Sequence, residues 1–378
     1  MDLYLDCAAT TKIDEDVLKK YSELLQNYYG STGSLHQYGQ DALMFENEAR
    51  FKIASLLKVK PNEVLFSSGA TEGNNYAIKG VAFQYKNRGN TIITTKVEHP
   101  SVLQCFEQLE KQYGFNCIYL DVDQNGVVDL EMLKKSLSND VILVSIMAVN
   151  HELGTIMPLK EIRKIINQYP KIIFHSDITQ AIGKTNIDFS LLDLASASSH
   201  KIHGIKGSGF VYKKEKVNLF PLISGHPAVN ELRAGTSPWQ ANVVLAIAIS
   251  KVLASLNPNY QLLKQNQIEI IEKIKNIDNL VINTNVEHSI PNIVNFSVRG
   301  YNPEVIIRAL SAKHIYVSSR SVCSVAKHDQ VSQTLYAMNK DMDICVSSIR
   351  VSYDSPLTSE EIDYFVDSLK EVIKTIRK

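Results

Sequence analysis

The sequence lacks an excess of charge of either sign. Its 378 residues include 40 basic and 40 acidic side chains, so the formal net charge at pH 7 is zero. Proteins that bind nucleic acid or a membrane surface usually carry a basic excess. We therefore expect no direct nucleic-acid partner and no membrane partner, and we expect a small substrate that is recognised locally.

The sequence also has little that would direct the chain into a membrane. Its first residues, MDLYLDCAATTK, contain an early acid and lack the basic segment followed by an apolar stretch that marks a secretory signal. Apolar runs such as residues 141–149 are too short to cross a bilayer. These absences predict a cytoplasmic protein.

Cysteine is scarce, and its spacing excludes two common uses. Five cysteines, an odd number without a CxxC pair, predict neither a disulfide framework nor a zinc site, so we expect no metal. Cys323 lies in the polar stretch SSRSVCSVAKHDQ, and loops carry reactive groups more often than cores do. The other four lie in or beside apolar runs, which predicts inert packed thiols: Cys7, Cys105, Cys117 and Cys345.

Helix and strand patterns alternate between about residues 40 and 215. Short, nearly continuous apolar runs predict strands that are buried on both faces. Helical or loop segments separate most of these runs, which include EVLFSS, TIITT, NCIYLDV, VILVSIM, KIIFHSD, DLASASS and GFVYK. The alternation predicts an α/β domain with a mostly parallel sheet flanked by helices.

The pattern changes after residue 240. ANVVLAIAISKVLASL predicts a long apolar helix, which we interpret as the connector to a second domain. Strand patterns in IVNFSV, IYVSS and SIRVSYD, and a final helix with a possible capping box of Thr358 and Glu361, predict a smaller α+β C-terminal domain. We expect a large domain over residues 14–254. We expect a small domain over residues 1–13 and 255–378, which carries the Cys323 loop.

Polar residues that follow the strands are the candidates for chemistry, because ligands of open α/β sheets bind beyond the carboxyl ends of the strands. In SSGATEG, backbone N–H groups at Gly69, Ala70 and Thr71 could hold a phosphate where a helix begins, although a structural junction would look the same. Asp177 ends the strand in HSDITQ. It could cap the next segment, or it could hold a proton on a ring nitrogen.

Two basic side chains stand at similar positions. His99 follows TIITT and could be structural, or its imidazole could stack on a flat ring and transfer protons near neutral pH. Lys201, in SSHKIHGIKGSG, could belong to a basic surface loop, or its amine could form a Schiff base in a cleft that disfavours its charged form. Together with a ring-nitrogen acid and a phosphate cradle, these side chains suit pyridoxal 5′-phosphate.

The same motifs carry a family resemblance. YLDCAATT, SSGATEGNN, EHPSV, VNHELGT, HSDITQAIGK, SSHKIHGIKGSG, LRAGT and SSIRVS follow the order found in cysteine desulfurases, and the sequence resembles that family over essentially its whole length. Cysteine desulfurases are pyridoxal-phosphate-dependent transferases of fold type I within the class-V aminotransferase group. The resemblance implies removal of sulfur from L-cysteine, which leaves L-alanine and a persulfide on Cys323. The sulfur would pass to an acceptor protein such as an iron–sulfur scaffold or a tRNA-thiolation enzyme.

The resemblance also implies roles for individual residues. Lys201 would be the Schiff-base lysine, His99 would stack on the ring, and either of them would move protons. Arg350 would clamp the substrate carboxylate, a task suited to a planar bidentate donor. Asp177 would contact the ring nitrogen. Asn150 and Gln180 would flank the ring and its phenolic oxygen, and Asn150 would also contact the substrate. The implied phosphate contacts come from Ala70, Thr71, Ser198 and His200, and Thr236 would reach the phosphate of a neighbouring subunit in a homodimer.

Three stretches depart from the usual pattern of the family. Arg320 and Val322 precede Cys323 where small residues are usual, SGHPAVNELRAGT lacks a run rich in glycine and glutamine, and YGSTGSLH replaces GNPSS. Arg320 could face solvent, raise the thiolate fraction of Cys323, or restrict the loop.

Two alternatives therefore stay open. One is another class-V activity, such as a selenocysteine lyase or an aminotransferase, although an aminotransferase needs no thiol. The other is a weakly active desulfurase-like subunit that binds partners. The intact HSDITQ and SSHK motifs disfavour the latter, because a scaffold has no physical need for a ring-nitrogen acid and a reactive amine.

Overall fold

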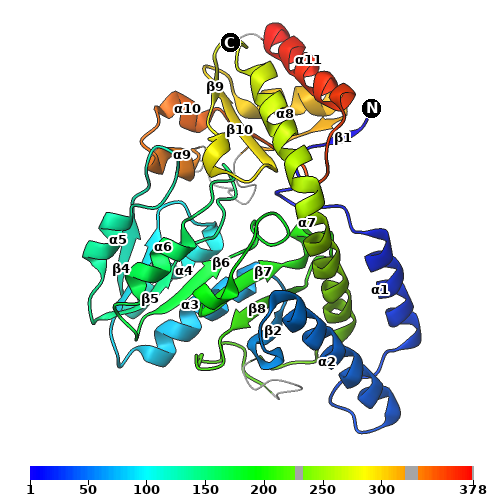
Figure 1. Cartoon of the computed structure of the whole chain (residues 1–378), viewed down its shortest axis with the longest axis vertical. Helices are drawn as coiled ribbons and strands as arrows, with labels where there is room; N and C mark the ends of the chain where they lie inside the picture. The colour runs from blue at the N-terminus through cyan, green and yellow to red at the C-terminus, as the bar shows by residue number, and fades with distance from the viewer. Residues whose placement is uncertain (226–232, 320–330, 377–378) are drawn as a thin grey trace.

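A seven-stranded sheet forms the centre of the larger part of the molecule (Figure 1). The structure is a computed structural model and describes residues 1–225, 233–319 and 331–376. The strand order is β2-β8-β7-β6-β5-β3-β4. The strands are β2 (Val64–Ser67), β3 (Thr91–Thr95), β4 (Asn116–Leu120), β5 (Val141–Ser145), β6 (Ile173–Asp177), β7 (Leu194–Ser198) and β8 (Gly209–Lys213).

The pairing of these strands is mostly parallel. The neighbours from β4 through β3, β5 and β6 to β7 pair in parallel, whereas β8 pairs antiparallel with both β7 and β2. The predicted α/β class with a mostly parallel sheet is therefore confirmed. The antiparallel direction of β8 was not predicted, and it turns the chain back immediately after β7.

Helices cover both faces of this sheet. Successive residues of β3 point to opposite sides, as the strand geometry requires. Ile92 belongs to an apolar cluster with Val81 and Phe106, and Ile93 belongs to another with Ile53. The helices of this part are α1 (Glu15–Asn27), α2 (Gln37–Leu57), α3 (Ala70–Tyr85), α4 (Pro100–Tyr113), α5 (Leu130–Ser136) and α6 (Leu159–Ile166), with short 3₁₀ turns η1 (Pro61–Glu63), η2 (Phe189–Leu191) and η3 (Ser199–Lys201).

A separate apolar cluster holds the C-terminal part together with the N-terminal strand. Its antiparallel sheet has the order β12-β10-β9, and β1 pairs in parallel with β11. The capping box of Thr358 and Glu361 that opens α11 is confirmed. The elements are β1 (Leu3–Tyr4), β9 (Leu280–Ile282), η4 (Val286–His288), β10 (Ile293–Val298), α8 (Pro303–Ala312), β11 (Ile315–Tyr316), α9 (Gln333–Ala337), α10 (Met342–Val346), β12 (Ser348–Ser352) and α11 (Ser359–Thr375).

One long helix, α7 (Trp239–Ile274), joins the two parts and runs along the side of the molecule in Figure 1. Val244 packs in the sheet cluster, and Ile270 packs in the C-terminal cluster. Among the described residues α7 alone is long and apolar enough to cross a membrane by length and composition, a test that a soluble core helix also passes. The domain limits near residues 13 and 254 stay a prediction.

Candidate active site

A cavity of about 240 Å³ opens at the carboxyl ends of β5, β6 and β7. The N-terminal segment, the start of α3 and a residue of β12 complete its walls. It lies where ligands of open α/β sheets bind. Nine of the residues singled out in the sequence line it: Ala70, Thr71, His99, Asp177, Gln180, Ser198, His200, Lys201 and Arg350.

Lys201 lies in the tight turn between β7 and the returning strand β8. The turn η3 follows β7 directly, so the sheet holds this segment on both sides. The Lys201 Nζ donates hydrogen bonds of 2.6 Å to the carbonyl oxygens of Ala8 and of Ala9. Burial, together with the nearby charges of Arg350 and Lys184, lowers the pKa of Lys201 to about 7. A substantial fraction of this amine is therefore uncharged and nucleophilic at neutral pH.

Asp177 supplies a buried negative charge at the end of β6. One carboxylate oxygen accepts from Asn74 Nδ2 at 2.7 Å, and the other accepts from the backbone N–H of Thr179 at 2.9 Å. These two donors fix the plane of the carboxylate beside the cavity. A cationic group in the cavity, such as a protonated ring nitrogen, would find its counter-ion here.

His99 caps the start of α4. Its Nδ1 accepts from the backbone N–H of Ser101 at 3.2 Å, so the proton of the neutral ring belongs on Nε2. Burial lowers the pKa of His99, and the charge of Asp177 opposes that shift. His151 meets it edge to face, with 5.3 Å between ring centroids.

The first residues of α3, Ala70 and Thr71, line the cavity. The N-cap residue of α3 is Gly69, with φ 144°, and a glycine has no side chain that could cap the helix. A Cβ at Gly69 would lie 3.1 Å from Ser198 Oγ, which accepts from the backbone N–H of Ala70 at 2.7 Å. Burial lowers the pKa of His200 to about 4, so that ring is neutral at pH 7. Backbone donors, a hydroxyl and the helix dipole together suit a phosphate.

Arg350 reaches the cavity from β12. Its guanidinium donates to the His151 carbonyl at 2.8 Å, and to Asp6 Oδ1 and Ser318 Oγ at 3.0 Å each. Its Nε is buried without a hydrogen-bond partner among the described residues. A buried donor without a partner is costly, so an incoming carboxylate would relieve that cost.

Three of the predicted site residues are not placed at the cavity. The side chain of Asn150 donates to Val97 O at 3.1 Å and to Thr334 Oγ1 at 3.3 Å, and it is not part of the cavity wall. Its amide is used within the protein, so its contact with a ring or a substrate stays a prediction. Thr236 is exposed and also lies outside the wall. Cys323 lies outside the described residues.

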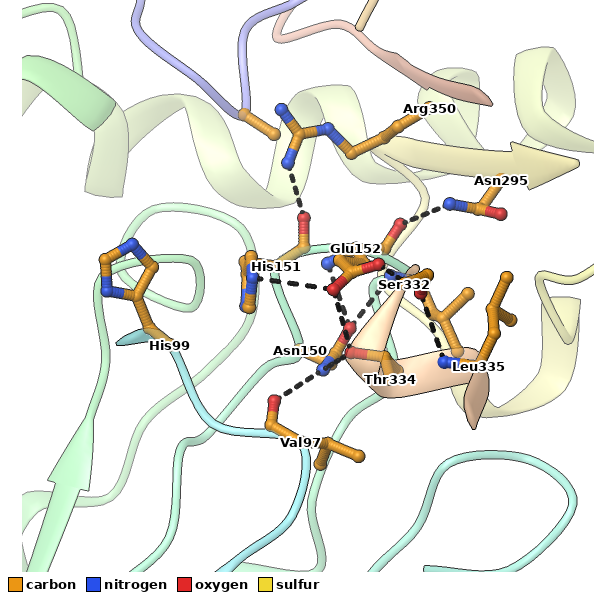
Figure 2. Close-up of polar contacts among 12 residues, drawn as sticks. Val97, His99, Asn150, His151, Glu152, Asn295, Ser332, Thr334, Leu335 and Arg350 are labelled. Atoms are coloured by element: carbon orange, nitrogen blue, oxygen red, sulfur yellow. Dashed lines mark hydrogen bonds and ion pairs between the residues drawn. The ribbon is translucent and has the colours of Figure 1, made fainter. Parts of the chain in front are cut away.

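Asn150 belongs instead to a buried network beside the cavity (Figure 2). Glu152 accepts hydrogen bonds from Ser332 Oγ at 2.5 Å and from Thr334 Oγ1 at 3.1 Å. Burial raises the pKa of Glu152. Asn295 Nδ2 donates to the Glu152 carbonyl at 3.3 Å, so the network joins the turn after β5 to α9 and β10.

Sequence reasoning missed three buried residues at this site. Burial raises the pKa of Glu98 to about 8, and its carboxyl group accepts from Met147 N and Thr95 Oγ1, both at 2.9 Å. Glu98 precedes His99 in EHPSV, and Lys184 lies in HSDITQAIGK four residues after Gln180. His151 likewise lies in the motif VNHELGT. The sequence shows these three residues within the family motifs, but it does not show that they are buried next to the site.

No group of three or more His, Cys, Asp or Glu side chains is placed to hold a metal ion in the part of the chain that the structure describes.

Comparisons with known proteins point to one family. Residues 3–365 match the model of class-V aminotransferases. The cysteine desulfurase IscS of Dictyoglomus turgidum is 37% identical over 379 residues, which cover 100% of this chain and 95% of that protein. A solved structure described as a NifS-like protein has a TM-score of 0.93 and 34% identity, with 100% of both chains covered. A structure described as SspA in complex with cysteine has a TM-score of 0.81 and 29% identity, and covers 94% of this chain and 99% of that one.

Proposed function

The chain belongs to the cysteine desulfurases of the class-V aminotransferase family, and we propose that it uses pyridoxal 5′-phosphate to remove sulfur from L-cysteine. The products are L-alanine and a persulfide on Cys323. The observation that carries the proposal is the meeting of an amine with a lowered pKa, a buried carboxylate, a neutral imidazole and a helix N-terminus around one cavity.

The residues present fit this cofactor. Pyridoxal phosphate, when bound, supplies an aldehyde that condenses with amines and a ring that takes up the electrons of a carbanion. The start of α3, with Ser198 and His200, would hold the phosphate. Asp177 would keep a proton on the ring nitrogen, and Gln180 would meet the phenolic oxygen.

The other side chains would act on the substrate. Lys201 and His99 would exchange protons with it, because the lowered pKa of each side chain gives it an uncharged form that can accept a proton near neutral pH. Arg350 would bind its carboxylate through the guanidinium group. Cys323, as a thiolate, would attack the substrate sulfur: the new bond joins the two sulfurs, the carbon–sulfur bond breaks, and the electron pair stays on the carbon.

We further propose a homodimer. Thr236 is exposed and lies outside the cavity of its own chain, which suits contact with the phosphate of a second copy. Large apolar side chains are exposed on α1, on α2 and between them: Leu18, Leu25, Tyr29, Leu35, Tyr38, Met44 and Phe51. A second copy would cover such a surface. An acceptor protein for the sulfur and a cytoplasmic location remain part of the proposal.

The test uses the purified protein with pyridoxal phosphate. We expect near-visible absorbance from the bound cofactor, and release of alanine and sulfide from cysteine under a reductant. The Cys323→Ala variant should keep the absorbance and lose sulfide release, whereas Cys345→Ala, which removes a buried thiol, should keep both. Unchanged sulfide release by Cys323→Ala would remove Cys323 from the mechanism. A preference for selenocysteine would favour the lyase alternative.

A further inference from the structure

Lys184 is a second buried lysine close to the reactive amine, and the mechanism above does not use it. It is 8% exposed and lies in the turn after β6. A small cavity of about 40 Å³ lies against both Lys184 and Lys201, and Lys201 also lines the substrate cavity. A lysine is rarely buried without a specific partner, so its contacts need an explanation.

Hydrogen bonds connect the two lysines through a glutamine and a carbonyl group. Lys184 Nζ donates to Gln180 Oε1 at 2.6 Å, and Gln180 Nε2 donates to the Ala8 carbonyl at 2.9 Å. The same carbonyl accepts from Lys201 Nζ at 2.6 Å. Because a lysine ammonium can only donate, Lys184 forces the oxygen of the Gln180 amide toward itself. The N–H₂ end of that amide then faces the Ala8 carbonyl, and both residues line the substrate cavity.

The charge of Lys184 also acts on Lys201. Burial lowers the pKa of Lys184 to about 8, so it is mostly protonated at pH 7. Its positive charge is one cause of the lowered pKa of Lys201. Several other titratable or charged groups interact electrostatically with Lys184 or Lys201. They are Asp6, Cys7, His99, His151, Asp177, His200, Arg350 and Asp354.

We propose that Lys184 is a positioning residue for the chemistry at Lys201. It fixes the Gln180 amide as a hydrogen-bond donor to the Ala8 carbonyl, and it places a second positive charge near the reactive amine, which favours the uncharged form of that amine. The inference rests on the proposed function, because the amine matters only if it captures an aldehyde. It assigns Lys184 no contact with substrate.

Cofactor capture by the apoprotein tests the proposal without turnover. Free pyridoxal phosphate already absorbs near the visible, and its band shifts to longer wavelength when its aldehyde condenses with an amine. The rate of this shift on mixing follows the uncharged fraction of Lys201, so it should rise with pH around a midpoint near 7. Three variants combine the charge and the donor of Lys184 differently. Lys184→Gln keeps a donor and removes the charge, Lys184→Met removes both, and Lys184→Arg keeps both.

We expect the midpoint to rise by about one pH unit in Lys184→Gln and in Lys184→Met, because the ammonium of Lys201 loses a repelling neighbour. Lys184→Arg should restore the midpoint of the original protein. Lys213→Met is the matched control. Lys213 is equally buried at 8%, but it donates to Val217 O at 2.8 Å and lies outside the cavity wall.

The outcomes separate this inference from the proposed function. An unchanged midpoint in folded Lys184→Gln overturns the inference alone, and this variant decides the matter if Lys184→Met does not fold. If the original protein causes no such band shift at any pH, the proposed function fails and the inference fails with it. A purely structural role for Lys184 would lower the melting temperature without moving the midpoint.

Discussion

One polar region lines the cavity and a second lies beside it, and the two differ in how their polar side chains are paired. The open region is made of Asp177, Gln180, Lys184, Lys201 and Arg350. Four of these line the cavity, and Lys184 lies behind them and donates to Gln180. In the closed region, made of Asn150, Glu152, Ser332 and Thr334, the side chains hydrogen-bond to one another and to nearby backbone groups.

Burying polar groups has a free-energy cost in both regions, and the comparison shows that this cost has a different consequence in each. In the open region, burial and like charges lower the pKa of the Lys201 amine to about 7, so a substantial fraction of it is uncharged at neutral pH. In the closed region, the same kind of burial is offset by internal hydrogen bonds, which attach α9 to the sheet part. The open region should therefore control chemistry, and the closed region should control stability.

The largest expected effect comes from the open region. Lys201→Ala removes the nucleophilic amine, so we expect turnover to fall by at least about 10³-fold and the near-visible absorbance to be lost. Absorbance spectra and alanine release measure this. Lys206→Ala, an exposed lysine in the same turn, should change neither. Retained turnover in Lys201→Ala would reject the assignment of Lys201.

The closed region should show the opposite behaviour. Glu152→Ala leaves the hydroxyls of Ser332 and Thr334 without their buried acceptor, so we expect the free energy of unfolding to fall by about 1–3 kcal/mol. Cofactor absorbance of the folded variant should be kept. Urea denaturation and spectra of the same samples measure both. If Glu152→Ala kept full stability and no longer bound the cofactor, the closed region would control cofactor binding and not stability.

Glu98 sharpens the comparison, because it is hydrogen-bonded like the closed region but stands beside His99. Burial raises the pKa of Glu98 from about 4.5 to about 8, so the folded protein holds a proton that the unfolded chain releases between these pH values. Stability should therefore fall as pH rises through this window, by up to about 1.4 kcal/mol per pH unit. Glu98→Gln, which mimics the protonated form, should lack this slope.

Urea denaturation at several pH values measures that slope, and Glu131→Gln, at an exposed position, is its control. Equal slopes for Glu98→Gln and the original protein would mean that Glu98 stays ionised in the fold.

Much of the fold could be predicted because the strands are short apolar runs between clear breaks. TIITT and GFVYK coincide with β3 and β8. The antiparallel β8 was missed, although only residues 199–208 separate it from β7, and a parallel crossover needs a dozen residues or more. The helix α7 continues through Pro258, because packing in two clusters outweighs the local cost of proline.

The candidate site was predictable where a residue ends a strand, as Asp177 does. It was not predictable where a role depends on distant partners. Lys184 gains significance only because the N-terminal segment brings the Ala8 carbonyl beside Gln180. The hydrogen bonds of the Asn150 amide to Val97 and α9 could not be predicted either, and its contact with a ring stays a prediction.

The shared helix α7 has a thermal consequence. Trp239 and Val244 of α7 pack in the sheet cluster, and Leu263 and Ile270 pack in the C-terminal cluster. Unfolding of either cluster therefore removes packing from the helix that stabilises the other. The two clusters should therefore unfold together on heating, and differential scanning calorimetry should record a single endotherm for the whole chain.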